Sequence, residues 1–388
     1  MRYALILGVL FAVTAANAQW EIQSAPTNAD LRGIHSLGNG IAWASGSDGT
    51  ILRTIDDGAH WQLCSIPPDA EKLDFRGIQA FDEKTAIVMS TGKGALSRLY
   101  KTTDGCQTWK RVFTNPDAEG SWDAFSMPNA GNGMLLGDPI NGGFSVRLIV
   151  TGKIDKLIDA GHPSLKADPT LQGAFAASNS ALFILKDAYR VYYGPPPLDR
   201  NMAEDVTPVE GEWFGTGGIV GAFVYTRNVP TGDDISEYGD PPHISWEKIK
   251  VPLRSGTASA GIFALCFYKG SQNAIHGVAV GGDYNLPGDA VGTAAFSLNV
   301  GSSWQAAIIP PHGFRSAVAY DEAAKTWITV GPNGTDLSTD DGRNWRAVRP
   351  NPALHEPADA DRNWNALSLP FVVGPHGRIG KLRPEALK

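Results

Sequence analysis

Arginine recurs at matching points of this sequence, and arginine is the side chain best suited to bidentate binding of carboxylates. Residues 30–34 read DLRGI and residues 74–78 read DFRGI, so Arg32 and Arg76 are equivalent, and Arg315 follows the same pattern further on. Guanidinium groups that converge could bind an acidic protein segment, a chain terminus or a sugar carboxylate. Whether they converge depends on the elements that position them.

The arginine segments belong to an internal repeat, in which each copy continues into an apolar strand, a glycine-rich turn, a second strand and a tryptophan. The equivalent positions are Arg32, Arg76, Trp122, Gln172, Ala260, Arg315 and Trp364. Most lie 44 to 55 residues apart, the length of four short strands with their turns, and the 88-residue interval after Gln172 holds an insertion. The repeat predicts an all-β fold, with one seven-bladed propeller over residues 19–388.

The two ends of the chain predict how this ring closes. In the first copy we expect strands at residues 33–37, 41–45, 50–54 and 61–66, joined by Gly, Asn and Asp turns. The last copy, residues 364–382, has room for only three strands. Residues 20–26 (WEIQSAP) match the fourth strand of the first copy (WQLCSIP, residues 61–67). The N-terminal strand should therefore complete the last blade and remove an open sheet edge.

A second motif, Ser/Thr-x-Asp-x-Gly-x-x-Trp, falls between the third and fourth strands. It is intact at residues 54–61 and 338–345, whereas Cys106 replaces the glycine at 102–109 and Asn299 replaces the aspartate at 297–304. This is the Asp-box of β-propellers, in which the carboxylate accepts backbone N–H bonds and the tryptophan packs on the next sheet. The residues expected in these structural roles are Asp56, Trp61, Asp104, Trp109, Asn299, Trp304, Asp340 and Trp345.

The arginine segments, the run GSDGTILRT at residues 46–54 and the Asp-boxes together resemble the photosystem II stability/assembly factor family. The resemblance covers nearly the whole chain after residue 18 and is clearest in the first, second and sixth copies. The third and fourth copies lack an intact Asp-box. The resemblance implies a seven-bladed propeller outside the cytoplasm that holds protein partners during assembly and has no catalytic residues.

A glycan-active propeller, either a sialidase-like hydrolase or a lectin, is the alternative, because sialidases bind a sugar carboxylate through three arginines. Sialidases usually carry Arg-Ile/Leu-Pro in the first blade, but no proline follows Arg32 here. The sequence contains no Gly-x-Ser-x-Gly, P-loop or His-Glu-x-x-His motif. We expect no cofactor and no metal, because the histidines are dispersed and the cysteines lack metal-ligand spacing.

The equivalent positions should begin the innermost strands and surround one mouth of the central channel, opposite the Asp-boxes. A cationic and aromatic collar for binding would then consist of Arg32, Arg76, Arg315, Trp122 and Trp364. The neighbouring turns add the candidate binding residues Asp48, Lys93, Asp138, Asp283, Tyr284, Asn333 and His376. Alternatively, each arginine pairs with a nearby aspartate and the tryptophans pack in the core.

Residues 1–18 resemble an export signal, because Arg2 precedes an apolar run that ends in Ala16-Asn17-Ala18. We therefore expect a periplasmic, lumenal or extracellular protein without stable membrane insertion. The formal charge of −7 would become about −8 without Arg2, which argues against nucleic-acid binding. In an oxidising compartment Cys64 and Cys106 are the better disulfide candidates, and Cys266 would stay unpaired.

Two insertions, residues 187–211 and 228–243, are rich in proline and acidic residues and map to the Asp-box face of the fourth blade. They are expected either to dock a partner or to form surface loops. Residues 152–160 could form a turn of helix or a strand.

Overall fold

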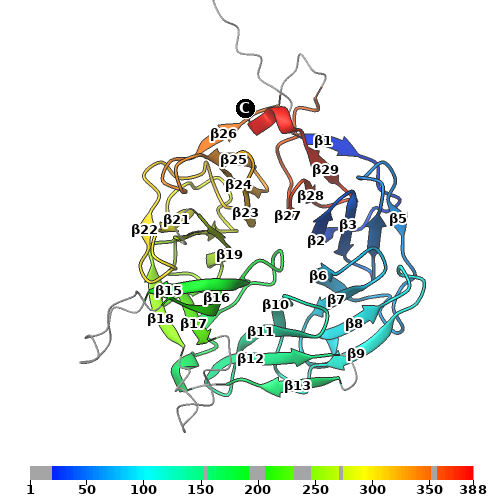
Figure 1. Ribbon diagram of the computed structural model, residues 1–388, viewed down its shortest axis with the longest axis horizontal. Coiled ribbons are helices and arrows are strands. Elements are labelled where there is room, and N and C mark those ends of the chain that lie inside the picture. Colours follow the sequence, from blue (N-terminus) through cyan, green and yellow to red (C-terminus); the bar gives the residue numbers. More distant parts are fainter. Residues whose placement is uncertain are drawn as a thin grey trace, which may run out of the picture.

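Antiparallel sheets arranged in a ring make up this chain (Figure 1). The computed structural model describes residues 20–151, 155–161, 163–191, 206–230, 246–270, 274–350 and 356–387. The predicted leader, residues 1–18, and parts of both predicted insertions lie outside these ranges. No helix within the described ranges is long and apolar enough to cross a membrane. The antiparallel sheets and their arrangement in a ring confirm the all-β prediction and a propeller-like architecture.

Five sheets have four strands each, and the strands follow one another as hairpins. The first two contain β2 (Leu31–Gly38), β3 (Ile41–Gly46), β4 (Ile51–Thr54) and β5 (Gln62–Leu63), then β6 (Asp74–Ala80), β7 (Ala86–Thr91), β8 (Arg98–Thr102) and β9 (Lys110–Thr114). The next contains β10 (Trp122–Ser126), β11 (Asn132–Ile140), β12 (Gly143–Val150) and β13 (Lys156–Asp159). Another contains β23 (Ala317–Asp321), β24 (Thr326–Gly331), β25 (Gly334–Ser338) and β26 (Arg346–Val348).

The remaining four-stranded sheet joins both ends of the chain. It contains β27 (Ala366–Ser368), β28 (Phe371–Val373), β29 (Ile379–Leu382) and, beside β29, β1 (Trp20–Gln23). Strand β1 runs antiparallel to β29, with Trp20 opposite Leu382. The Trp20 indole is buried, lies 5.9 Å from the Trp364 ring and donates a 3.0 Å hydrogen bond to the Thr335 hydroxyl. The first strand is thus fixed to two neighbouring sheets.

A nine-stranded sheet contains two successive hairpin series. One series has β14 (Gln172–Gly173), β15 (Leu182–Val191), β16 (Val206–Gly218), β17 (Ala222–Pro230) and β18 (Glu247–Val251). The other has β19 (Ala260–Lys269), β20 (Ile275–Asp283), β21 (Ala294–Ser297) and β22 (Gln305–Ala306). The two series are joined by a single pair, Gly217 opposite Gly261. Three short 3-10 helices complete the described structure: η1 (Gly94–Leu96), η2 (Pro163–Leu165) and η6 (Pro384–Leu387).

Part of the first predicted insertion is regular sheet rather than loop. Strands β15 and β16 pair from Leu182 opposite Phe214 to Val191 opposite Val206. A surface-loop interpretation of residues 187–211 is therefore wrong at both ends of that range, because these backbone groups pair with each other. Residues 192–205 and 231–245 lie outside the described ranges. Residues 156–159 form a strand, so the strand alternative is correct there.

All four predicted Asp-boxes form the same hydrogen-bonded turn. In the first, the Asp56 carboxylate accepts bonds from the Thr54 hydroxyl (2.9 Å) and the His60 amide (3.0 Å), and the Gly58 amide donates to the Thr54 oxygen (3.0 Å). Equivalent bonds surround Asp104, Asn299 and Asp340. The hydrogen bonds at these four positions are those expected of an Asp-box turn.

The Asp-box tryptophans fill the space between neighbouring sheets. Trp61 meets the Phe371 ring edge-on at 5.5 Å, and Trp109 meets Trp43 at 6.4 Å. Trp304 and Trp345 are buried as well, and each indole N–H donates to the glycine carbonyl of its own box. Tryptophan burial of this kind contributes apolar area on both sheet faces, which is why the core lies between the sheets rather than in one centre.

Cys64 and Cys106 form a disulfide, and Cys266 is the free cysteine. Cys64 follows β5 of one sheet, and Cys106 lies in the Asp-box of the next, so the bond joins adjacent sheets at their outer edges. The pair that the sequence favoured is therefore the pair that forms.

Candidate functional site

A repeated close contact shows which residues are equivalent where the inner strands begin. Six glycines in or directly after a strand that pairs with an inner strand leave no room for a Cβ, because it would overlap a carbonyl oxygen close to the start of that inner strand. These glycines are Gly46, Gly137, Gly218, Gly281, Gly331 and Gly374, and their carbonyl partners are Asp30, Ser121, Leu171, Gly261, Phe314 and Asn363. Each carbonyl residue thus marks the same point in its series.

The residue that follows each of these carbonyl residues packs between neighbouring sheets. In chain order, these residues are Leu31, Trp122, Gln172, Ile262, Arg315 and Trp364, and each is at most 8% exposed. Phe75 holds the same place beside β7, where Ser90 is its partner. The following residue is a bulge in four series: Arg32, Arg76, Asp123 and Phe263. Of these bulged residues, Arg32 and Arg76 are partly exposed, whereas Asp123 and Phe263 are buried.

The predicted collar is therefore wrong for three of its five members. Trp122, Arg315 and Trp364 are fully buried, because they align with Leu31 and not with Arg32. Gln172 is one residue out of register in the same way, and Ala260 lies three residues before Phe263. A shift of one residue moves a side chain from the bulge position that Arg32 and Arg76 hold into the packing between sheets.

Arg315 is held inside the protein by acceptors of its own chain. Its Nε donates to Asp336 Oδ2 at 2.9 Å, and one terminal nitrogen donates to the Phe314 carbonyl at 2.7 Å. Burial raises the pKa of Asp336, but the hydrogen bonds and charges of His312 and Arg315 outweigh it and leave that pKa below its usual value. This charge is neutralised within the fold, so three arginines do not converge on one ligand.

Arg32 and Arg76 remain partly accessible, with side chains 31% and 30% exposed. Arg32 lies 3.6 Å from Asp30, and Arg76 donates from Nε to Asp74 at 2.8 Å. Asp123 is buried beside Arg76, and one of its carboxylate oxygens has no hydrogen-bond partner among the described residues. Burial and the charge of Asp138 raise the pKa of Asp123 well above its usual value, against the opposing charge of Arg76.

The turns that follow the second strand of a series lie beside the start of its inner strand, as Leu31 opposite Gly46 at the end of β3 shows. We call this side the arginine face. Asp48, Lys93, Tyr284 and His376 are exposed there. Asp138, Asp283 and Asn333 instead bind within the fold. They accept from the Ala174 amide, the Thr257 hydroxyl and Arg315, respectively.

The same face carries an apolar patch, of which the sequence interpretation had included only Tyr284. Its members are Ile219, Val220, Tyr284, Leu286 and Val291, each between 46% and 69% exposed. They belong to the β16–β17 turn and the β20–β21 turn, and both turns bond to the segment between β18 and β19 through Gly256 to Gly218, and Arg254 to Gly292. The length of the second turn was the one available sequence signal.

The channel is crossed by residues 174–181, which connect β14 to β15 and which we call the crossing segment. The Ala176 carbonyl accepts from Arg76 at 2.9 Å, and the Ser178 hydroxyl donates to the Ser316 carbonyl at 2.8 Å. The Phe175 ring stacks on Phe263 at 3.9 Å. These contacts reach opposite sides of the ring. The crossing segment therefore separates the arginine face from the rest of the channel.

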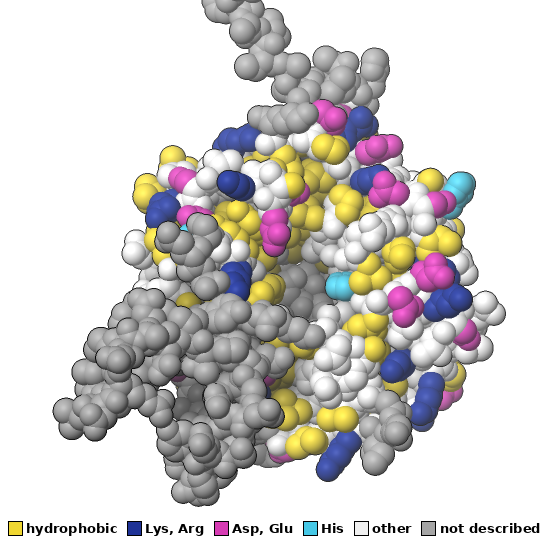
Figure 2. Space-filling view, in the orientation of Figure 1, with side chains coloured by type: hydrophobic (Ala, Val, Ile, Leu, Met, Phe, Trp, Pro, Cys, Tyr) yellow, Lys and Arg dark blue, Asp and Glu magenta, His cyan; other side chains and the backbone are white. Residues whose placement is uncertain are grey.

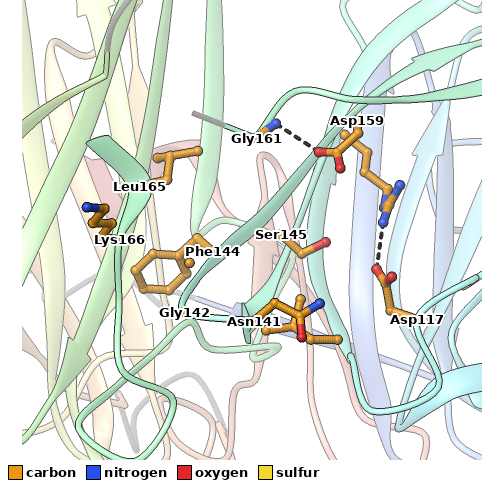
Figure 3. Close-up of a pocket in the computed structure, with 12 residues that line it drawn as sticks. Asp117, Asn141, Gly142, Phe144, Ser145, Asp159, Gly161, Leu165 and Lys166 are labelled. Atoms are coloured by element: carbon orange, nitrogen blue, oxygen red, sulfur yellow. Dashed lines mark hydrogen bonds and ion pairs between the residues drawn. The ribbon is translucent and has the colours of Figure 1, made fainter. Parts of the chain in front are cut away.

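A cavity of about 340 Å³ lies outside the ring centre, around the β11–β12 turn (Figure 3). Arg147 donates to Asp117 at 2.6 Å beside it, and the Asp159 carboxylate accepts from the Gly161 amide at 2.8 Å. These charged groups already have partners in the fold. No set of three or more His, Cys, Asp or Glu side chains within the described ranges is arranged to hold a metal ion.

Comparisons of structure confirm the fold likeness that the sequence indicated. A structure of YCF48 bound to D1 peptide has 15% sequence identity and a TM-score of 0.55, with 94% of this chain and 97% of that chain covered. YCF48 from Cyanidioschyzon merolae has 18% identity and a TM-score of 0.56, with 95% and 100% covered. U3-55K has 11% identity and a TM-score of 0.55, with 94% and 98% covered. Comparisons with models of protein families and with curated sequences gave no match.

Proposed function

We propose that this chain is an exported, non-catalytic β-propeller that binds an extended protein segment across its arginine face and acts in protein assembly. The fold is shared with YCF48, a photosystem II assembly factor, and one of the similar structures is YCF48 bound to a peptide. The comparison brings peptide binding to this chain as a hypothesis, which the chemistry of its own surface supports.

We infer seven blades and a closed ring. The nine-stranded sheet contains two hairpin series that share one residue pair, so it counts as two blades beside the five four-stranded sheets. The pairing of β1 with β29 supports closure. Export is supported by the disulfide between Cys64 and Cys106, since such bonds persist in oxidising compartments, and by the apolar leader in the sequence.

The observation that carries the binding proposal is the combination of charge and apolar surface on the arginine face. Arg32 and Arg76 lie at the channel end, partly exposed, while the apolar patch lies over the β16–β17 and β20–β21 turns. Exposed apolar side chains that gather on one face mark interaction sites more often than scattered ones do. An extended segment with an acidic group or terminal carboxylate near the arginines and apolar residues near the patch matches this surface.

Selection from a random peptide library tests this proposal. Peptides enriched on the wild-type protein should combine acidic and apolar residues. Their affinity should fall about tenfold for Val291→Ser with Leu286→Ser, and by a similar factor for Arg32→Gln with Arg76→Gln. The matched control is Leu63→Ser with Ile55→Ser, which removes exposed apolar side chains elsewhere.

Peptides whose binding survives both arginine-face variants and is lost in the control would refute the proposed surface. Thermal unfolding of each variant distinguishes a lost contact from a lost fold. If only the variant with Val291→Ser and Leu286→Ser weakened binding, Arg32 and Arg76 would not be part of the binding surface. The proposed preference for an acidic segment would then be wrong.

A further inference from the structure

On the other side of the crossing segment, the channel contains a cavity of about 310 Å³. Its walls come from strands all around the ring: β2, β6, β10, β15, β19, β23 and β27. The face drawn in Figure 2 is hollowed at the centre of the ring. The cavity therefore lies on the ring axis, apart from the arginine face.

Both apolar and polar residues line the cavity. Ile34, Ile78, Leu182, Leu265 and Val318 are at most 7% exposed and pack mainly in the core between the sheets. The uncharged polar residues His35, Gln79, Ser126 and Ser368 therefore form much of the wall. The described lining contains no Lys, Arg, Asp or Glu. A charged ligand would lose its hydration there without gaining an opposite charge, which costs several kcal/mol in a site of this kind.

Two amides on the wall already have partners for both of their polar ends. Gln79 donates to the Met127 carbonyl and accepts from the Met127 amide, each at 2.7 Å. Asn179, from the crossing segment, bonds in the same reciprocal way to Phe125 at 3.0 and 2.8 Å. These amides fix the wall but offer few free groups to a ligand.

His35 has a free donor toward this cavity. Its Nδ1 accepts the Ala80 amide N–H at 3.2 Å, so the ring proton of the neutral side chain is on Nε2. Burial lowers the pKa of His35 to about 4, so the ring is neutral at physiological pH. Among the described contacts, Nε2 of His35 and the hydroxyl of Ser126 have no partner. The cavity thus combines a wall without charged side chains with one oriented, uncharged N–H donor.

We propose that this channel cavity binds a small, uncharged molecule whose carbonyl, ether or hydroxyl oxygen accepts a hydrogen bond from Nε2 of His35. A volume of about 310 Å³ lies within the range of pockets that hold small organic ligands. The crossing segment contributes Ser178, Asn179 and Ser180 to the cavity wall. The ligand site is independent of the proposed peptide surface.

A matched pair of fluorescent probes tests this assignment. The neutral ketone 6-propionyl-2-(dimethylamino)naphthalene should bind with one site per chain and a blue-shifted emission. The anion 6-(dimethylamino)-2-naphthoate has the same ring system and should bind at least about tenfold more weakly. Equal affinity for both, or no saturable binding of the ketone, would overturn the proposal.

Three variants locate the site. His35→Asn retains an acceptor for the Ala80 amide but loses the Nε2 donor, and should weaken ketone binding roughly threefold to tenfold. Ala319→Phe should fill the cavity and abolish binding, whereas Leu63→Ser, on an exposed strand, should leave it unchanged. Unchanged ketone affinity in both cavity variants would show that the probe binds elsewhere and would overturn the assignment.

Cys266 gives a second readout in the wild-type protein, because it lines the cavity and is the free thiol. Burial raises the pKa of this thiol to about 12, so its modification by methyl methanethiosulfonate is followed at alkaline pH. Saturating ketone should slow that reaction, and undiminished modification would contradict the proposal even if a variant failed to fold. Arg32→Gln with Arg76→Gln should not alter ketone binding. If library-selected peptides and the ketone displace each other, the cavity is part of the peptide site and the small-molecule assignment fails.

Discussion

Asp104 and Asn299 perform the same task with different side chains. Each accepts the amide at the fourth position after it, Thr108 or Ser303, through Oδ1 at 3.0 Å. The second contact is reversed: the Thr108 hydroxyl donates to Asp104, whereas Asn299 donates from Nδ2 to the Ser303 hydroxyl. A hydroxyl can donate or accept, so either side chain completes the turn. The turn therefore needs an oxygen at Oδ1 more than it needs a negative charge.

We expect Asp104→Asn to leave the melting temperature nearly unchanged at neutral pH, and Asp104→Ala to lower it by about 2 °C through lost turn bonds. Hydrogen bonds from the Thr108 hydroxyl and amide lower the pKa of Asp104 to about 2. Its stabilising contribution is therefore present above pH 4 and is lost as the pH falls toward 2. Asn cannot titrate, so the acid-induced part of the loss should be smaller in that variant. Thermal unfolding of the wild type and both variants between pH 7 and pH 2 measures these changes. If the wild type and Asp104→Asn lost stability equally on acidification, this account of Asp104 would be wrong.

At the scale of the elements, the Asp-box turn of the second sheet differs from the others. Cys106 has a φ of 66°, in the left-handed region where Gly58, Gly301 and Gly342 stand in the other boxes. A residue with a Cβ costs about 1 kcal/mol more than glycine in this conformation. The disulfide to Cys64 offsets this cost, since it links two sheets across 42 residues of chain.

The two cysteines should thus respond unequally to mutation. Cys64→Ala loses the disulfide and keeps the unfavourable backbone at Cys106, and should cost about 3 kcal/mol of unfolding free energy. Cys106→Gly loses the same bond but relaxes the turn, so it should cost about 1 kcal/mol less. Denaturant unfolding measures the difference. Under reducing conditions the wild type should approach Cys64→Ala, and a Cys106→Gly variant that is the less stable of the two would contradict this account.

The sequence predicted the strands, the Asp-boxes and the cysteine pair because each has a local signature. It did not predict the register of the inner strands. These strands are largely buried on both faces, as in Trp122–Ala124, so no alternation of polar and apolar residues shows which side chain lies at the channel mouth. The crossing segment was also missed, since its small and polar residues stabilise it only through contacts with distant strands.

At the scale of the whole molecule, the first strand is the element on which ring closure depends. The Trp20 side chain is 1% exposed and packs with Trp364, while β1 covers the edge of β29. An uncovered β29 would expose unpaired backbone groups, which promotes association between sheet edges.

We therefore expect Trp20→Ala to cost about 3–5 kcal/mol through loss of core packing. Trp20→Phe retains much of the packing but loses the hydrogen bond to Thr335, and should cost less. A chain lacking residues 20–23 should elute as larger species in size-exclusion chromatography. An equally stable, monomeric truncated protein would show that β1 contributes little to the ring. Glu21→Gln, at an exposed position of the same strand, is the matched control.

The pairing of β1 with β29 also has a consequence for the order in which the protein is made. The strand synthesised first has no partner until nearly every other residue has been synthesised, because its partner ends at Leu382. Earlier sheets can form as soon as their own hairpins emerge, but the final one must wait for both ends of the chain. Translation that stops early would thus release a molecule with two unmatched ends, and a circular permutant with residue 387 linked to residue 20 would make all strands of that sheet neighbours in sequence.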